Sequence, residues 1–194
     1  MEALRRAGKA WLEKATHPLI AWFDARRVTP NQLSVTGLIV TLASTPLIAT
    51  GWLTTGAILF GLGSLTDALD GALARHHAQA SKFGAFLDST FDRIGEGAAL
   101  VALAVYFANA DRNAAVAATA VAMLSGNLTS YVRARAESLG VNCEVGWVSR
   151  TERVTIMGLG MLLHVPEYMI YLLAALTSFT VGQRVWHVHR RLAE

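Results

Sequence analysis

The sequence predicts an all-α integral membrane protein with six transmembrane helices and a preceding interfacial helix. Hydrophobic residues make up 53% of its 194 residues, more than a soluble globular domain needs, so the excess is expected to face lipid. Apolar stretches recur near residues 32–50, 53–66, 94–108, 114–130, 154–165 and 168–186. Most approach the length of about 20 residues that a helix needs to cross a bilayer. No linker or repeat interrupts the chain, so residues 1–194 are expected to form one domain, with the six-helix bundle over 29–190.

Residues 1–28 are expected to form an amphipathic helix that lies in the membrane interface. Aromatic and aliphatic residues alternate there with lysines and arginines. The segment lacks the continuous apolar core of a cleavable signal peptide. An ordinary solvated helix is the alternative. Thr29, Pro30 and Asn31 then mark the start of the first span, because proline is favoured in the first helical turn.

The basic residues predict the orientation in the membrane. They gather at the N-terminal segment, at alternate connections between spans and at the C-terminus, whereas the opposite connections carry Arg112 alone. By the positive-inside rule, both termini and the basic connections face the cytoplasm of a multi-pass cell-membrane protein. A net charge of +3 does not indicate nucleic-acid binding, since no motif of a nucleic-acid module is present. Cys143 is the single cysteine, so no internal disulfide can form.

Four aspartates interrupt the second and third apolar regions. At about 100° per residue, Asp67 and Asp70 share one helix face and Asp88 and Asp92 share another. Glycines and alanines beside them leave room for a ligand and allow close helix approach. The short turn between the two regions predicts antiparallel neighbours, with all four carboxylates close together at the cytoplasmic end.

Four carboxylates at membrane depth need neutralisation, and hard divalent cations provide it. A set of oxygen ligands favours Mg²⁺, with Mn²⁺ possible, and two ions would balance four charges. Paired metals suit phosphoryl transfer, and one carboxylate could deprotonate an attacking hydroxyl. The alternatives are solvated acids at helix ends, an ion transporter with a carboxylate relay, and a non-catalytic membrane scaffold.

Residues 67–92 fit the pattern D-x2-D-G-x2-A-R-x8-G-x3-D-x3-D, with eight fixed positions in 26 residues. This pattern resembles the signature of the CDP-alcohol phosphotransferase family. The resemblance implies six membrane helices, a homodimer and a CDP-activated lipid donor. It also implies that Asp67, Asp70 and Asp88 bind metal and that Asp92 touches metal and acts as the catalytic base. The donor-binding residues that it implies are Asn31, Gln32, Leu33, Ser34, Gly71, Ala74, Arg75, Ser81 and Gly84.

The second half of the chain bears on the acceptor alcohol. The segments 86–93, 130–137 and 150–153 resemble those of phosphatidylinositol-phosphate synthases, and archaeal synthases of the matching archaetidyl lipid are similar at the same places. An acceptor that carries phosphate needs a cationic pocket, for which Arg133, Arg153 and Arg184 are the candidates. The predicted acceptor is a phosphorylated polyol, inositol 1-phosphate first, and glycerol 3-phosphate is the alternative. Positive-inside topology alone is the other reading of these arginines.

Overall fold

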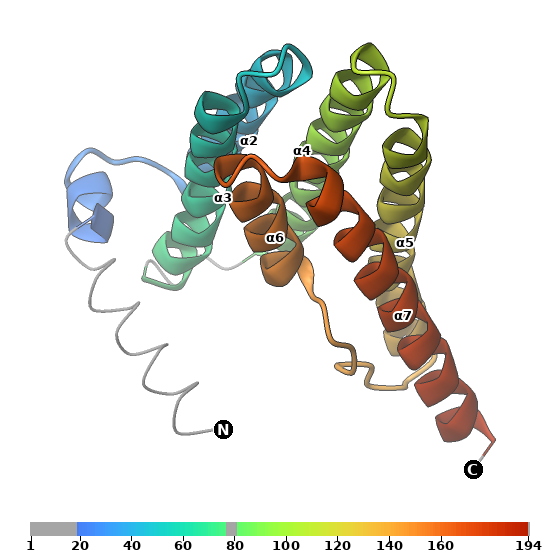
Figure 1. The fold of residues 1–194 in the computed structure, drawn as a ribbon. Coiled ribbons are helices and arrows are strands. Elements are labelled where there is room, and N and C mark those ends of the chain that lie inside the picture. The colour runs from blue at the N-terminus through green and yellow to red at the C-terminus, as the bar shows by residue number, and fades with distance from the viewer. Residues whose placement is uncertain (1–18, 77–80, 194) are drawn as a thin grey trace.

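The computed structural model describes residues 19–76 and 81–193, and every regular element in these ranges is an α-helix (Figure 1). Six full helices follow one another along the chain. They are α2 (Pro30–Ala49), α3 (Leu53–His76), α4 (Lys82–Asn109), α5 (Asn113–Ser138), α6 (Arg150–Leu162) and α7 (Pro166–Leu192). The all-α prediction is therefore confirmed. Residues 19–25 are also helical, but 1–18 lie outside the described residues, so the interfacial helix over 1–28 stays a prediction.

Three of the described helices are long and apolar enough to cross a membrane by themselves, namely α2, α5 and the Leu53–Arg75 part of α3. The charged residues of α4 and α7 make these two long helices less apolar. The 13 residues of α6 rise only about 20 Å, short of the roughly 30 Å of a bilayer core. The structure thus supports a multi-pass membrane protein, and the count of six crossings stays a proposal.

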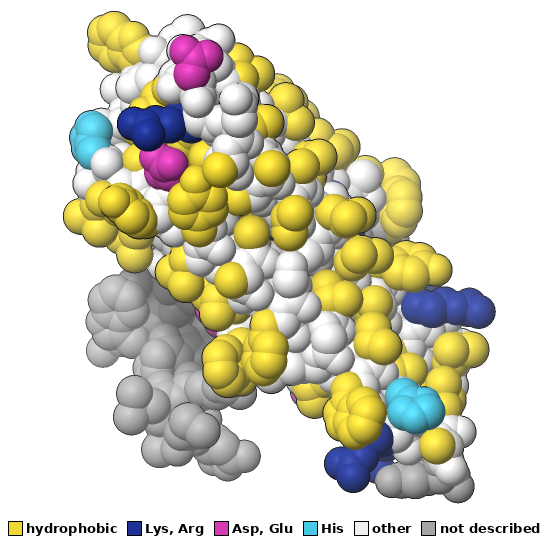
Figure 2. All heavy atoms as spheres, turned by 45° about the vertical axis from the view of Figure 1, so that its right-hand side comes forward, with side chains coloured by type: hydrophobic (Ala, Val, Ile, Leu, Met, Phe, Trp, Pro, Cys, Tyr) yellow, Lys and Arg dark blue, Asp and Glu magenta, His cyan; other side chains and the backbone are white. Residues whose placement is uncertain are grey.

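The outer surface agrees with a membrane environment. In Figure 2 apolar side chains cover the middle of the visible face, while the charged side chains gather towards its two ends. Many large apolar residues on the outside of the described helices are more than a third exposed, among them Ile39, Leu62, Val101, Leu124 and Phe179. Such a belt is costly in water and favourable in lipid.

Helix α2 is the common packing partner of α3 and α4, while α5 packs on α4 and α7, and α6 packs on α3 and α7 (Figure 1). The pair α3 and α4 is absent from these closely packed pairs of described helices. The two aspartate-bearing spans, expected as antiparallel neighbours, are thus held mainly through α2, which supplies the surface on which both pack.

Small residues allow α2 to approach both helices. A Cβ on Gly63 of α3 would lie 2.8 Å from the carbonyl oxygen of Gly37 on α2 and would also collide with the Thr41 hydroxyl. A Cβ on Gly95 of α4 would lie 3.0 Å from the Thr41 methyl. The main apolar core includes Ile48, Phe60, Leu103, Phe107, Met157, Met161 and Ile170.

Candidate active site

Three carboxylates from two helices meet at one point. Asp67 and Asp70 of α3 and Asp88 of α4 each offer an oxygen, and these oxygens all lie within 4.8 Å of one another. Asp70 is only 5% exposed, and the Ser34 hydroxyl of α2 donates a hydrogen bond to its Oδ2. A compact set of carboxylate oxygens without nitrogen or sulfur has the donor chemistry of a hard divalent cation. These residues therefore fit the predicted metal.

Asp92 is not part of this group of three. Its Oδ1 lies 2.7 Å from Nη2 of Arg150, the first residue of α6, and Nη1 of the same arginine lies 2.5 Å from Oδ2 of Asp67. Both carboxylate oxygens are buried, and among the described residues neither has a partner aligned well enough for a hydrogen bond, so the contacts are ion pairs held by charge. The structure brings Asp92 to the edge of the cluster, with Arg150 between it and Asp67.

A cavity of about 710 Å³ opens beside the three carboxylates. Its wall includes seven of the nine predicted donor-binding residues, which are Asn31, Ser34, Gly71, Ala74, Arg75, Ser81 and Gly84. Arg150 also lines it. The volume lies in the range of ligand sites in proteins, and the wall combines carboxylates, two cations and backbone left open by glycine. The cavity can therefore hold a polar ligand next to the carboxylate group.

Gln32 and Leu33 do not line the cavity. The Gln32 side chain accepts a hydrogen bond from the Thr29 backbone N–H at 2.9 Å, and Thr29 Oγ1 accepts one from the Gln32 N–H at 3.3 Å. This reciprocal pair caps α2. Leu33 is 4% exposed and packs with Ile20 and Leu73. In this structure both side chains serve the fold, and their contact with the donor stays a prediction.

At the start of α4, Ser81 and Gly84 form the cap that shapes the cavity wall. The Gly84 N–H donates to Ser81 Oγ at 2.9 Å, and a Cβ on Gly84 would lie 3.1 Å from that oxygen. The exposed Arg75 guanidinium lies near Gly71, 3.5 Å from where a Cβ on that glycine would be. Because Gly71 and Gly84 carry no side chains, this part of the cavity wall leaves space beside the carboxylates.

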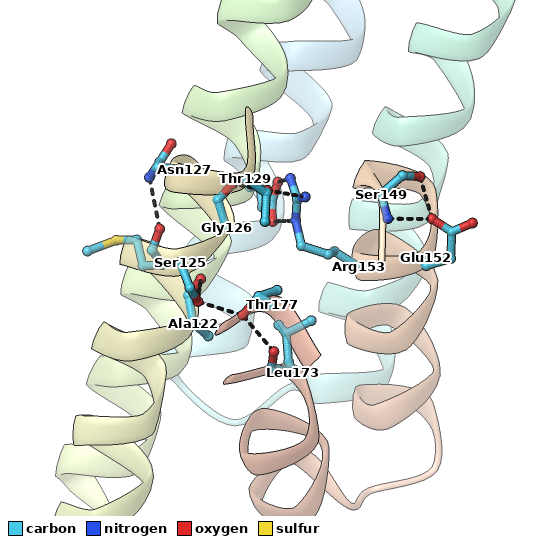
Figure 3. A network of polar contacts seen from close by, with 12 residues as sticks. Ala122, Ser125, Gly126, Asn127, Thr129, Ser149, Glu152, Arg153, Leu173 and Thr177 are labelled. Atoms are coloured by element: carbon cyan, nitrogen blue, oxygen red, sulfur yellow. Dashed lines mark hydrogen bonds and ion pairs between the residues drawn. The ribbon is translucent and has the colours of Figure 1, made fainter. Parts of the chain in front are cut away.

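The three predicted acceptor arginines come from α5, α6 and α7. Arg153 and Arg184 are buried and meet at Thr129 of α5. Arg153 Nη1 donates to the Thr129 hydroxyl at 3.2 Å (Figure 3). Arg184 donates to the Thr129 carbonyl. Arg133 is exposed, pairs with Glu137 at 2.8 Å, and lies within electrostatic reach of Arg184. The structure thus brings these arginines into one region.

Sequence reasoning missed two charged residues, Arg150 and Glu96. The carboxylate of Glu96 on α4 accepts two hydrogen bonds from Arg153, at 2.6 and 2.7 Å. Its spacing was a usable signal, because Asp88, Asp92 and Glu96 recur every four residues and so share one helix face. Arg150 gave no comparable signal, since a basic residue at a cytoplasmic helix end is ordinary topology.

Comparison with known proteins decides what kind of site this is. Residues 27–182 match the family model described as CDP-alcohol phosphatidyltransferase. The chain belongs to this family. It is accordingly an enzyme of the CDP-alcohol phosphatidyltransferase class, and the resemblance drawn from residues 67–92 is confirmed.

Relatives narrow the likeness within the family. The chain is 40% identical to archaetidylinositol phosphate synthase of Methanothermobacter thermautotrophicus, over 87% of each chain. It is 41% identical to phosphatidylinositol phosphate synthase of Corynebacterium glutamicum, over 82% of this chain and 77% of that protein. The crystal structure of Mycobacterium tuberculosis phosphatidylinositol phosphate synthase with CDP-DAG bound matches with a TM-score of 0.84 and 30% identity, covering 90% of this chain and 94% of the other. The same enzyme in complex with manganese and citrate matches with a TM-score of 0.81 and 31% identity, over 89% and 88%.

Proposed function

We propose that this phosphatidyltransferase moves a phosphatidyl-type group from a CDP-linked lipid to a hydroxyl of a phosphorylated polyol, inositol 1-phosphate first. One observation carries the proposal: a carboxylate cluster suited to metal lies against a cavity lined by donor-binding candidates, with a group of arginines on neighbouring helices. The inositol-lipid synthases among the relatives support the choice of acceptor, and both their diacyl and archaetidyl forms make CDP-diacylglycerol and CDP-archaeol the donors to test.

Asp67, Asp70 and Asp88 would hold Mg²⁺, or Mn²⁺ in its place, and a second ion would draw on Asp92. Bound metal draws negative charge off the donor diphosphate and stabilises the leaving group. Asn31, Ser34, Gly71, Ala74, Arg75, Ser81 and Gly84 would then surround the CDP moiety. The low wall at Gly71 and Gly84 admits a nucleotide, and the Arg75 fork offers paired donors to its oxygens.

Asp92 is the proposed base. Its carboxylate takes the proton of the acceptor hydroxyl, the hydroxyl oxygen forms a bond to the lipid-side phosphorus, and the bond from that phosphorus to the CMP oxygen breaks. CMP leaves with the electron pair of the broken bond, and the lipid product keeps the phosphate ester. Arg150 holds Asp92 at 2.7 Å, which keeps the carboxylate in a fixed position.

An acceptor that carries phosphate brings about two negative charges, which need cations in a partly dry site. Arg153 uses three of its N–H groups on Glu96 and Thr129, and Arg184 uses two on Thr129 and Val145. A guanidinium has five N–H donors, so both retain free donors. Arg133 is exposed and can turn towards them. This arrangement supports Arg133, Arg153 and Arg184 as the acceptor phosphate site.

We further propose that α2 to α7 all cross the membrane, with both termini and the active site on the cytoplasmic side, and that two copies form a homodimer. The basic residues at the ends of α3, α5 and α7 and at the start of α6 support this orientation. The short α6 crosses as part of the bundle, packed on α3 and α7.

The test is a product assay on the purified protein in nanodiscs. CDP-diacylglycerol or CDP-archaeol is incubated with Mg²⁺ and either inositol 1-phosphate or glycerol 3-phosphate, and the lipid product is identified by mass spectrometry. The expected product is the inositol-phosphate lipid together with one CMP per lipid. Asp92→Asn serves as the inactive variant, and Asp111→Asn, in the exposed turn between α4 and α5, is its matched control. A glycerophosphate lipid as the preferred product would refute the acceptor assignment.

A further inference from the structure

Two arginines of α6 reach two carboxylates of α4, one helical turn apart. Arg150 meets Asp92 at 2.7 Å, and Arg153 meets Glu96 through two bonds of 2.6 and 2.7 Å. The first pair lies in the proposed active site. In the second pair Arg153 is a proposed acceptor arginine, whereas Glu96 lies outside the cavity beside the three carboxylates and has no role in the proposed function.

The Glu96 and Arg153 pair is deeply buried. Arg153 is 4% exposed and Glu96 is 9% exposed, and Thr129 supplies a further acceptor for the guanidinium (Figure 3). Gly126 of α5 leaves the space for the pair, since a Cβ there would lie 3.5 Å from Glu96 Oε1 and 3.6 Å from Arg153 Nε. A buried ion pair with two aligned hydrogen bonds fixes both partners, because separation would leave each charge uncompensated.

Backbone packing does not give α6 its position relative to α4. Helix α6 packs on α3 and α7, and the pair α4 and α6 is absent from the closely packed pairs of described helices. The long arginine side chains span that gap. Arg150 and Arg153 are three residues apart and so lie on the same side of α6, about 60° apart around its axis. A constraint on Arg153 is consequently a constraint on the direction of Arg150.

We propose that Glu96 is a positioning residue for the transfer reaction: by fixing Arg153 it sets the first turn of α6, and so holds Arg150 between Asp67 and Asp92. The inference rests on the proposed function, in which Asp67 binds metal and Asp92 is the base. Glu96 itself touches neither donor nor acceptor in this scheme. Its effect on acceptor binding passes through Arg153, and its effect on the rate of the transfer step passes through Arg150.

The activity test is a double-mutant cycle on CMP release in nanodiscs. Displacement of a catalytic group by about 1 Å can cost about 100-fold in rate, so Glu96→Gln is expected to lower kcat by roughly that factor with little change in the KM for CDP-diacylglycerol. In an Arg150→Gln background, Glu96→Gln should then add less than about a threefold loss, because both changes disable the same contact. Losses that multiply independently would overturn the proposal.

A second readout needs no acceptor, so it remains informative whatever alcohol the enzyme uses. Isothermal titration with Mn²⁺ is expected to give tighter binding for Arg150→Gln, because a cation beside Asp67 is removed. Glu96→Gln should also tighten Mn²⁺ binding if it releases Arg150. If Arg150 stayed in place, loss of the negative charge of Glu96 would leave the affinity for Mn²⁺ unchanged or lower it. Unchanged or weaker Mn²⁺ binding in Glu96→Gln would therefore reject the positioning role.

Two further variants control for folding. Glu96→Asp keeps the charge but is one methylene shorter, so it is expected to fold even if Glu96→Gln does not. Its kcat should lie between those of the wild type and Glu96→Gln. When combined with Arg150→Gln, it should cause no further loss of kcat. Glu167→Gln removes a partly buried acid near the start of α7, which lies 3.8 Å from Arg112 and is remote from the proposed site. It should leave kcat and Mn²⁺ affinity as in the wild type.

Discussion

Gly63→Ala offers the sharpest test of the packing that supports the site. A Cβ at this position would lie 2.8 Å from the Gly37 carbonyl oxygen and 2.9 Å from the Thr41 N–H nitrogen, and closer still to the Thr41 hydroxyl. A side-chain hydroxyl can rotate away, but the two backbone atoms belong to α2 and can yield only if the helices separate. Overpacking of this kind costs about 2–3 kcal/mol at the upper end of its range. The better helix propensity of alanine offsets about 1 kcal/mol, which leaves a destabilisation of roughly 1–2 kcal/mol.

The matched control is Gly61→Ala, two residues earlier on the same helix. A Cβ there has no neighbour within 4 Å, so only the gain in helix propensity remains and stability should be unchanged or slightly higher. Thermal unfolding of both variants in the same detergent measures the difference, with Mn²⁺ titration alongside. Separation of α2 from α3 draws Ser34 away from Asp70, so Gly63→Ala should also bind Mn²⁺ more weakly. Equal stability of the two variants would refute the close approach of α2 and α3.

Three other predictions concern single residues. Asp92→Asn should fold and bind donor, measured by ultrafiltration of labelled CDP-diacylglycerol nanodiscs, yet it should no longer release CMP. Retained CMP release would exclude Asp92 as the base. Asp70→Asn removes one of three clustered charges and should weaken Mn²⁺ binding at least about tenfold by titration, while an unchanged affinity would place the ion elsewhere. Burial raises the pKa of the Cys143 thiol, so a smaller fraction of it is present as the reactive thiolate at a given pH. Iodoacetamide should therefore label the folded protein at least about tenfold more slowly than the SDS-unfolded protein, and the labelling rate should rise with pH. Equal rates would show that the thiol is accessible.

The carboxylate cluster could be predicted because its information is local. Asp67 and Asp70 share a face through helix geometry alone, and the 26-residue pattern adds Asp88 across one turn. Asp92 satisfies the same local rule, since it follows Asp88 by four residues. Its actual partner is Arg150, which arrives from a distant helix. Spacing along one helix does not specify which residue of another helix will reach it.

Helical geometry also explains why only part of the first donor segment lines the cavity. Four successive residues turn through about 300°, so a run such as 31–34 cannot face one site together. Asn31 and Ser34 are three apart and share the cavity side. Leu33 points into the core, and Gln32 caps the helix. A resemblance that names a segment therefore needs the helical phase to select the members that meet the ligand.

The role of α2 follows from contacts that its own apolar sequence does not reveal. Thr41 lies against Gly63 of α3 on one side and against Gly95 of α4 on the other, so the thickness of α2 sets how far apart the two aspartate-bearing helices stand. Nearer the cavity, Ser34 of the same helix bonds to Asp70. Because α3 and α4 are not closely packed on each other, the distance between Asp67, Asp70 and Asp88 depends on this intermediate helix. Bulk added to α2 at Gly37 should therefore disturb metal binding even though that residue carries no ligand, since its Cβ would meet the Gly63 carbonyl oxygen at 3.0 Å.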